Sequence, residues 1–284
     1  MGYVFCGLIV FSLFFRLYIG RRIDVRLGFN MVVVGKSKTT IMSFKPESLS
    51  IDYVELPDDL KIDLSVGGPD FGIKELREVE VVGDVTLESF RRGLSLDLGI
   101  VLTVIIRHEG ENDLISVRES LMDFGKTKTN LNFLDRLEIV RLLDVVLARG
   151  LNLSQSFPSR LTDRIIELDG KSYLKVNDSI YAWTRNYFMS EAVLSETAEI
   201  MVVNESGIEG TGRKVSKQVE TVGMRVVEVR ASDVVLDKKC VVNGDKMKHP
   251  MTMKYLEKYL ECEVGADGLE VRETDMIILI GKRF

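Results

Sequence analysis

Residues 200–215 read Ile200-Met-Val-Val-Asn-Glu-Ser-Gly-Ile-Glu-Gly-Thr-Gly-Arg-Lys-Val215, and this stretch decides how the last third of the chain folds. Its first four residues are apolar and predict a short buried strand, and Asn-Glu-Ser-Gly predicts a turn. A helix is then expected over 210–222, because valines recur there at spacings of four and three, and Gly223 follows as a stop. A strand, a turn and a one-sided helix are the start of an α/β unit.

The pattern continues regularly to the end of the chain. The expected strands are 199–203, 224–229, 239–242 and 276–280, and the expected helices are 210–222 and 252–260. This order, β-α-β-β-α-β, builds a small sheet that is covered on one side by two helices. We therefore predict a C-terminal domain over 198–284, preceded by a short connection at 189–197.

The middle of the chain predicts a larger domain over 27–190. The expected strands are 30–35, 39–44, 51–55 and 100–106, the expected helices are 70–82, 86–98, 114–124 and 133–147, and a hairpin joins 165–168 to 173–176 through Asp169-Gly170. Strands and helices are mixed without a strict repeat. The predicted fold class is α/β of the α+β kind.

The N-terminus carries one apolar stretch, from Tyr3 to Ile19, interrupted only by Arg16. About 17 residues is the lower limit for a helix that crosses a bilayer, and an arginine near its end can extend to the headgroups. We therefore predict a transmembrane anchor over 1–22. A buried soluble helix and a cleaved signal peptide are the alternatives.

The orientation of this anchor depends on flanking charge. Arg21 and Arg22 follow the apolar stretch, and the positive-inside rule places that side in the cytoplasm. A basic extension ahead of Met1 would reverse this orientation and place the body outside the cytoplasm. This second orientation is the one we expect: a single-pass protein of the cell membrane with an extracytoplasmic body.

Composition excludes several classes of protein. The chain of 284 residues is 45% hydrophobic and 29% charged, as globular proteins are, and its net charge is −5. Four of its arginines lie before residue 27, so the body is more acidic still and is poorly suited to bind nucleic acid. Two histidines and three cysteines, without CxxC or HExxH, exclude the common zinc frameworks.

Few residues suggest chemistry by themselves. Gly35-Lys36-Ser37 follows an apolar strand as a phosphate loop would, but the glycine required five positions earlier is Asn30, which favours a plain turn. Asp58-Asp59 after Pro57 could hold Mg²⁺, although adjacent carboxylates in such loops are more often solvated. His108 and His249 lack a nearby nucleophile motif and are expected at the surface.

Together, the last 85 residues or so resemble the LytR C-terminal domain. The resemblance rests on the stretch quoted above, on Thr221-Val-Gly-Met-Arg-Val-Val-Glu228, and on Asp275-Met-Ile-Ile-Leu-Ile-Gly-Lys282. Asn204, Ser206 and Gly207 occupy the family's turn motif. Glu205 and Met224 depart from it, where the family has a glycine and an aromatic residue.

The region from Asn30 to Ile106 more faintly resembles the LytR-CpsA-Psr domain. Lys38-Thr-Thr-Ile-Met42 is similar to its Asp-Thr-Ile-Met strand, and Leu56-Pro-Asp-Asp59 to its Ile-Pro-Arg-Asp turn. The resemblance implies transfer of glycopolymers from a polyprenyl-phosphate carrier to peptidoglycan, with arginines on the pyrophosphate and carboxylates on Mg²⁺. Only Asp59 matches this site, because Asp58 stands at the arginine position and a threonine at the strand aspartate.

The resemblance leads us to expect a membrane-anchored cell-envelope protein of LytR type with a non-catalytic binding or scaffolding role. Expected partners are the membrane and a cell-wall polymer or envelope proteins, with no nucleic acid and no catalytic or metal-binding residue beyond the weak candidate Asp59. The alternatives are an active Mg²⁺-dependent phosphotransferase, which alone would need Mg²⁺ as a cofactor, and a cytoplasm-facing regulator.

A disulfide between Cys240 and Cys262 is expected in the C-terminal domain. The predicted topology can bring the end of the second helix close to the strand that feeds it, within the Cα separation of about 5 to 6 Å that a disulfide requires. Two buried free thiols are the alternative. An extracytoplasmic body favours the bond.

Overall fold

The structure is a computed structural model, and it describes residues 20–64, 70–78, 86–150, 152–167, 170–265 and 274–284. Its strands are β1 (Phe29–Val34), β2 (Thr39–Lys45), β3 (Ser50–Leu56), β4 (Lys61–Asp63), β5 (Asp70–Gly72), β6 (Leu102–Arg107), β7 (Lys128–Thr129), β8 (Asn152–Ser156), β9 (Thr162–Ile166), β10 (Ser172–Val176), β11 (Glu199–Asn204), β12 (Arg225–Ala231), β13 (Cys240–Gly244), β14 (Glu263–Val264) and β15 (Met276–Ile280). Its α-helices are α2 (Ile73–Glu78), α3 (Leu87–Leu98), α4 (Leu114–Met122), α5 (Phe133–Arg149), α6 (Ser179–Tyr187), α7 (Glu191–Leu194), α8 (Thr211–Val222) and α9 (Pro250–Tyr259).

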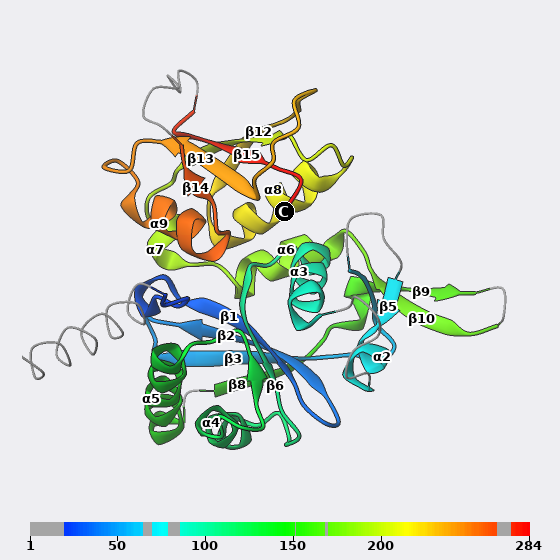
Figure 1. Cartoon of the computed structure of the whole chain (residues 1–284). Coiled ribbons are helices and arrows are strands. Elements are labelled where there is room, and N and C mark those ends of the chain that lie inside the picture. The colour runs from blue at the N-terminus through cyan, green and yellow to red at the C-terminus, as the bar shows by residue number, and fades with distance from the viewer. Residues whose placement is uncertain (1–19, 65–69, 79–85, 151, 168–169, 266–273) are drawn as a thin grey trace, which may run out of the picture.

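A six-stranded mixed sheet, in the order β7-β6-β1-β2-β3-β8, forms the larger part of the molecule (Figure 1). The central strand β1 is buried on both faces, since successive side chains of a strand point to opposite sides. Met31 and Val33 belong to the core that includes α4 and α5, while Val32 and Val34 belong to the core that includes α3. Strands β1 and β6 run parallel, so both end at the same edge of the sheet.

A five-stranded sheet in the order β12-β11-β15-β13-β14 forms the C-terminal part. Helix α8 connects the parallel strands β11 and β12, and β15 lies between β11 and β13. The expected β-α-β-β-α-β order is present, with β14 as an additional short edge strand. The connection expected at 189–197 contains the short helix α7.

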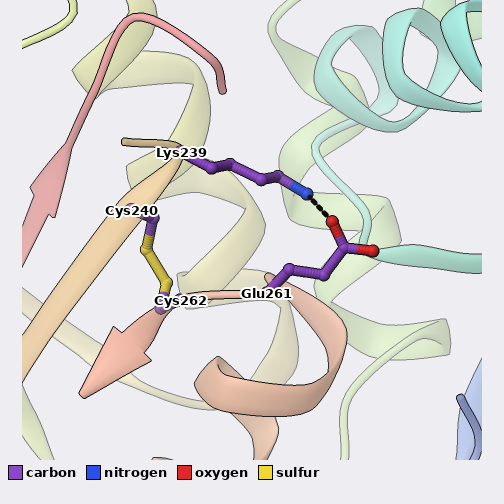
Figure 2. Close-up of a disulfide and its surroundings, with 4 residues drawn as sticks. All are labelled: Lys239, Cys240, Glu261 and Cys262. Atoms are coloured by element: carbon purple, nitrogen blue, oxygen red, sulfur yellow. Dashed lines mark hydrogen bonds and ion pairs between the residues drawn. A yellow bond between two sulfur atoms is a disulfide. The ribbon is translucent and has the colours of Figure 1, made fainter. Parts of the chain in front are cut away.

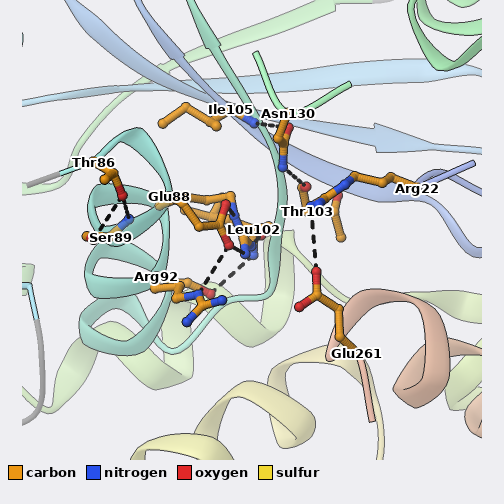
Figure 3. A network of polar contacts seen from close by, with 12 residues as sticks. Arg22, Thr86, Glu88, Ser89, Arg92, Leu102, Thr103, Ile105, Asn130 and Glu261 are labelled. Carbon is orange, nitrogen blue, oxygen red and sulfur yellow. Dashed lines mark hydrogen bonds and ion pairs between the residues drawn. The ribbon is translucent and has the colours of Figure 1, made fainter. Parts of the chain in front are cut away.

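Residues 20–24 join both parts of the molecule. The Arg22 amide donates to the Asp135 carboxylate on α5 at 2.8 Å, and the Arg22 guanidinium lies 3.5 Å from Glu261 after α9 (Figure 3). The Asp24 amide donates to the Tyr259 hydroxyl, which in turn donates to the Asp24 carbonyl, both at 2.9 Å. The start of the described chain is therefore fastened to α5 and to α9.

Cys240 on β13 and Cys262 after α9 are joined as a disulfide, with their Cα atoms 4.5 Å apart (Figure 2). Each cysteine follows one member of an ion pair, because Lys239 donates to Glu261 at 2.6 Å. Burial lowers the pKa of Lys239, although Glu261 opposes this shift. Both cysteines are buried. The bond and the ion pair thus connect the same two segments.

One expected helix needs correction, and the expected membrane anchor lies outside the described residues. The helix expected over 70–82 is replaced at its start by β5, which pairs with β4, and α2 begins only at Ile73. Residues 79–82 lie outside the described part, and so does the apolar stretch at 3–19. Among the residues that the structure describes, no helix is long and apolar enough to cross a membrane.

Candidate anion-binding site

A cavity of about 530 Å³ opens at the edge of the six-stranded sheet where β1 and β6 both end. Ligands in α/β proteins commonly bind outside the carboxyl ends of parallel strands, since the loops that follow diverge there. The cavity is lined by Gly35, Lys36, Arg77, Arg107, His108, Glu109, Lys126 and Lys128. Five of these eight residues carry positive side chains, in a chain whose net charge is −5.

The turn after β1 forms one wall. The Gly35 amide donates to the Lys38 carbonyl at 3.0 Å, and the Lys36 amide to the Gly110 carbonyl at 3.3 Å. These amides are already engaged, so the segment is the plain turn that the sequence favoured and not a phosphate cradle. Lys36 nevertheless contributes its exposed side chain to the cavity.

Two arginines of the cavity wall are held by hydrogen bonds. Arg77 makes a two-pronged pair with Asp58, with nitrogen-to-oxygen distances of 2.7 and 2.9 Å. The Arg77 hydrogen bonds hold the pKa of Asp58 below its usual value. Arg107, the last residue of β6, donates to the Arg77 carbonyl at 3.1 Å. Both guanidinium groups are thus held in place by the protein, one by the Asp58 carboxylate and the other by a main-chain carbonyl.

His108 is the one histidine of the cavity wall, and it is only 6% exposed. Its Nδ1 accepts from the Gly110 amide at 3.2 Å and lies 2.9 Å from the Ser120 hydroxyl, which places the proton of the neutral ring on Nε2. Burial lowers its pKa, and the nearby Asn112 side chain opposes this in part. His108 is therefore a neutral donor at pH 7.

Both histidines were expected at the surface, and that expectation was wrong. His249 is 5% exposed and lies directly before α9, where its amide donates to Asp245 and its Nε2 is 3.4 Å from Asp275. A sequence without a nucleophile motif gives no signal for such burial.

The carboxylates singled out in the sequence do not form a Mg²⁺ site. Both oxygens of Asp58 are held by Arg77, and Asp59 is a half-exposed residue that lies 3.9 Å from Arg164. Neither aspartate lines the cavity. In the described ranges, no group of three His, Cys, Asp or Glu residues could hold a metal ion. These donors do not fit the metal that the resemblance implies.

The LytR-type turn motif is a closed hydrogen-bond network. The Ser206 amide and hydroxyl both donate to the Asn204 side-chain oxygen, at 3.2 and 2.7 Å, and the Ile208 amide donates to the Ser206 hydroxyl. Gly207 has a φ of 74°, which favours glycine. These hydrogen bonds fix the turn between β11 and α8. That Asn204, Ser206 and Gly207 mark the family remains a prediction.

Sequence reasoning missed Arg77, Arg107, Lys126 and Lys128. Arg107 closes an apolar strand, so a basic residue at the end of a buried strand was an available signal. Lys126 lies just before β7 and Lys128 begins it, and this strand is too short to be recognised in the sequence. Arg77 gave no signal, because it lies in a segment that was expected to be one uninterrupted helix.

Comparison with known proteins finds similarity only to solved structures. No protein-family model and no curated protein matches the chain. EF0465 from Enterococcus faecalis, described as a transcriptional regulator, is 9% identical with a TM-score of 0.43, over 84% of this chain and 98% of that one. Lin1025 from Listeria innocua is 11% identical with a TM-score of 0.43, over 57% and 97%.

A third solved structure is YwtF (TagT) with bound octaprenyl pyrophosphate lipid, described as a LytR-CPS2A-psr family protein. It is 10% identical with a TM-score of 0.37, over 57% of this chain and 89% of that one. Likeness at this level does not identify what the present chain binds or does. The solved structures to which this chain is similar include LytR-CPS2A-psr family proteins, the family that the sequence resembles.

Proposed function

We propose that this chain is a membrane-anchored cell-envelope protein that binds a phosphate-bearing envelope polymer or its lipid-linked form, without transferring it. The observation that carries the proposal is the basic cavity at the ends of β1 and β6. Five cations line the cavity with one carboxylate, Glu109, and although Arg77 is paired with Asp58, positive charge remains in excess there. This excess attracts a multiply charged anion, and the acidic remainder of the chain disfavours binding elsewhere. Arginine pairs are well suited to the oxygens of a phosphate or diphosphate.

A non-catalytic role is supported by the carboxylates. Phosphoryl transfer relies on metal ions or cations that stabilise developing charge, and the aspartates near this cavity are either paired with Arg77 or directed elsewhere. The cavity therefore has groups to hold an anion but lacks, among the described residues, the donors for Mg²⁺.

A transferase is the second candidate, and His108 is the observation in its favour. It is a buried, neutral imidazole in the wall of a cationic cavity, where it could exchange a proton with a bound hydroxyl group. In this second proposal the cell-wall polymer is a substrate that the protein transfers, whereas in the first it is only bound.

The binding test uses the full chain in detergent and calorimetric titration with inorganic pyrophosphate and with a short prenyl diphosphate. Lys128→Gln should weaken binding of both about tenfold, the equivalent of about 1.4 kcal/mol. Lys246→Gln removes the same charge from a lysine that pairs with Glu257 away from the cavity, and should leave binding unchanged. If both variants bind pyrophosphate with the same affinity, the cavity is not the binding site.

Turnover separates the two candidates. With Mg²⁺ and a prenyl diphosphate we expect no release of phosphate. Release that is abolished in Asp59→Ala would overturn the non-catalytic proposal and support a metal-dependent transferase. Release that is abolished in His108→Gln but not in Asp59→Ala would support a transferase that works through the cavity imidazole.

A further inference from the structure

Helices α4 and α5 expose an apolar surface that no described residue covers. Its side chains are Ile115 and Met122 on α4, Phe124 just after it, and Phe133 and Leu137 on α5, exposed by 56, 48, 48, 49 and 38%. We call these five residues the α4–α5 face. Ile115 and Met122 are two helical turns apart and Phe133 and Leu137 are one turn apart, so each pair lies on one side of its helix.

The two helices present one continuous surface. The Phe124 and Phe133 rings lie 5.4 Å apart, and an ion pair between Arg118 and Asp144 links α4 to α5. The Arg136 guanidinium lies 4.9 Å from the Phe124 ring centre. In Figure 1 both helices lie on the side of the six-stranded sheet away from the five-stranded sheet. An exposed surface with two phenylalanines at its centre is unusual for a protein that meets only water.

The apolar N-terminal stretch joins the body beside this face. The Asn132 side chain, which caps α5, donates to the Gly20 carbonyl at 2.8 Å. Arg21 lies 3.8 Å from Asp135 and 3.5 Å from Glu138, both on α5. The residue that follows the stretch at 3–19 is therefore held at the first turn of α5, immediately next to Phe133.

This attachment leaves almost no linker. A chain advances at most about 3.6 Å per residue, and Gly20 itself is already bound to the body. If residues 3–19 lie in a bilayer, the first turn of α5 must lie at its surface. Aromatic side chains and arginines are the residues that proteins place at membrane interfaces.

We infer that the α4–α5 face rests on the lipid bilayer, with Phe133 and Phe124 inserted at the interface and Arg21 and Lys126 toward the headgroups. The inference rests on the anchor in the proposed function. It fixes which side of the body meets the membrane. Because Phe124 and Lys126 lie in the same loop, and Lys126 lines the basic cavity, the cavity opens beside the membrane-facing surface.

The test measures fluorescence quenching by brominated phospholipids in vesicles that contain the full chain. The only native tryptophan, Trp183, is 8% exposed and provides a constant background. Phe133→Trp and Leu137→Trp place a reporter on the face, and Met247→Trp places one at an 89% exposed position in the C-terminal part. We expect bromolipid to remove at least half of the added emission of Phe133→Trp, less of Leu137→Trp, and none of Met247→Trp.

A parallel alkaline wash of the vesicles reports on the anchor. If the protein resists the wash while the Phe133→Trp emission stays unquenched, the anchor is supported, and the inference that the α4–α5 face contacts the bilayer is overturned. Protein that is washed away would remove the anchor and the inference together. A blue-shifted but unquenched Phe133→Trp would place the face against another protein, for example a second copy, and would also overturn the inference.

Discussion

Gly35 is the position in the cavity wall that has no room for a side chain. A Cβ atom there would lie 2.0 Å from the Asn112 side-chain oxygen and 2.8 Å from the Gly110 carbonyl. Asn112 cannot easily move, because its amide donates to the carbonyls of Val33 and Lys38. Gly35→Ala should therefore destabilise the fold by about 1 to 3 kcal/mol and weaken pyrophosphate binding.

Thermal unfolding and calorimetric titration of the variant check this expectation. Gly125→Ala is the matched control, because a Cβ there meets only the Asp123 carboxylate, at an ordinary 3.7 Å. It lies in the loop that carries Lys126, so it also tests the neighbourhood of the cavity. Equal melting temperatures for the two variants would show that the turn at Gly35 can adapt.

The roles of individual residues were harder to predict from the sequence than the helices and strands. Asp58 stands where the family that the sequence resembles has an arginine, and the sequence therefore indicated that a cation for the diphosphate was missing. The structure instead pairs Asp58 with Arg77, 19 residues later, and this arginine lines the cavity. A position-by-position comparison cannot detect a charge that is supplied from another segment of the chain.

At the scale of elements, the start of α5 has two separable functions. The Asn132 side-chain oxygen accepts from the Asp135 amide at 2.8 Å, and its nitrogen donates to Gly20. Asn132→Ala removes both bonds and should cost about 1 kcal/mol of stability. Asn132→Asp keeps the cap and loses the donor to Gly20, so it should recover most of that loss in urea unfolding. Equal losses in both variants would mean that the bond to Gly20 matters more than the cap.

The disulfide connects β13 to the segment after α9, and its presence in cells depends on where the body lies. A closed loop of this length contributes about 3 kcal/mol in the chain-entropy model. With an extracytoplasmic body, alkylation at lysis should find neither Cys240 nor Cys262 free, and reduction should lower the melting temperature. Two free thiols would argue for a cytoplasmic body. Cys240→Ala with Cys262→Ala should melt like the reduced protein.

Elements with a clear periodicity were predictable from the sequence. The strands around residues 31, 41 and 53, the helices α3, α4, α5, α8 and α9, and the succession of strands and helices along the C-terminal part all followed from apolar spacing. Short elements did not, because β5, β7, β14 and α7 have too few residues to show a period. They form by pairing with neighbours that only the tertiary structure supplies.

At the scale of the whole molecule, a cluster of charges joins α8 of the C-terminal part to α3 and β4 of the N-terminal part. Lys214 of α8 donates to Asp97 of α3 at 2.6 Å and lies 3.4 Å from Asp63 of β4. Burial, a hydrogen bond with Asp70 and the charge of Asp97 raise the pKa of Asp63 to about 6, although Lys214 opposes the shift. Near neutral pH the folded protein thus holds Asp63 in an unfavourable ionised form.

This pKa gives a pH-dependent prediction. Between about pH 4 and 6 the folded state keeps a proton on Asp63 that the unfolded state has lost, so the contribution of Asp63 to stability falls as the pH rises through that window. Asp63→Asn should add about 1 kcal/mol at pH 7 and little at pH 4, a value discounted for partial solvation. Urea unfolding at both pH values measures it. Asp97→Asn, which weakens the bond to Lys214, should destabilise instead; stabilisation by both variants would mean simple charge repulsion.

The division into parts at residues 190–198 stays a prediction. The six-stranded and the five-stranded sheet lie on different sides of this boundary in the sequence, but one apolar core contains residues from both sides of it, including Leu27 and Tyr255, together with Val193 of the connection. Apolar periodicity in the sequence reports on each sheet and carries no information about how much surface the two bury against each other.

The attachment of residues 20–24 also determines how the protein would respond to tension. A protein anchored in a membrane and bound to a wall polymer is pulled from two sides, and the force would enter the body at Gly20. The bonds of Gly20 and Arg21 to the start of α5 would bear the load first, then the bond of Arg22 to Asp135, and then those of Asp24 to Tyr259. Releasing residues 20–23 would lengthen the molecule by about 14 Å at full extension. The cavity, formed at the far ends of β1 and β6, would keep its shape over that distance.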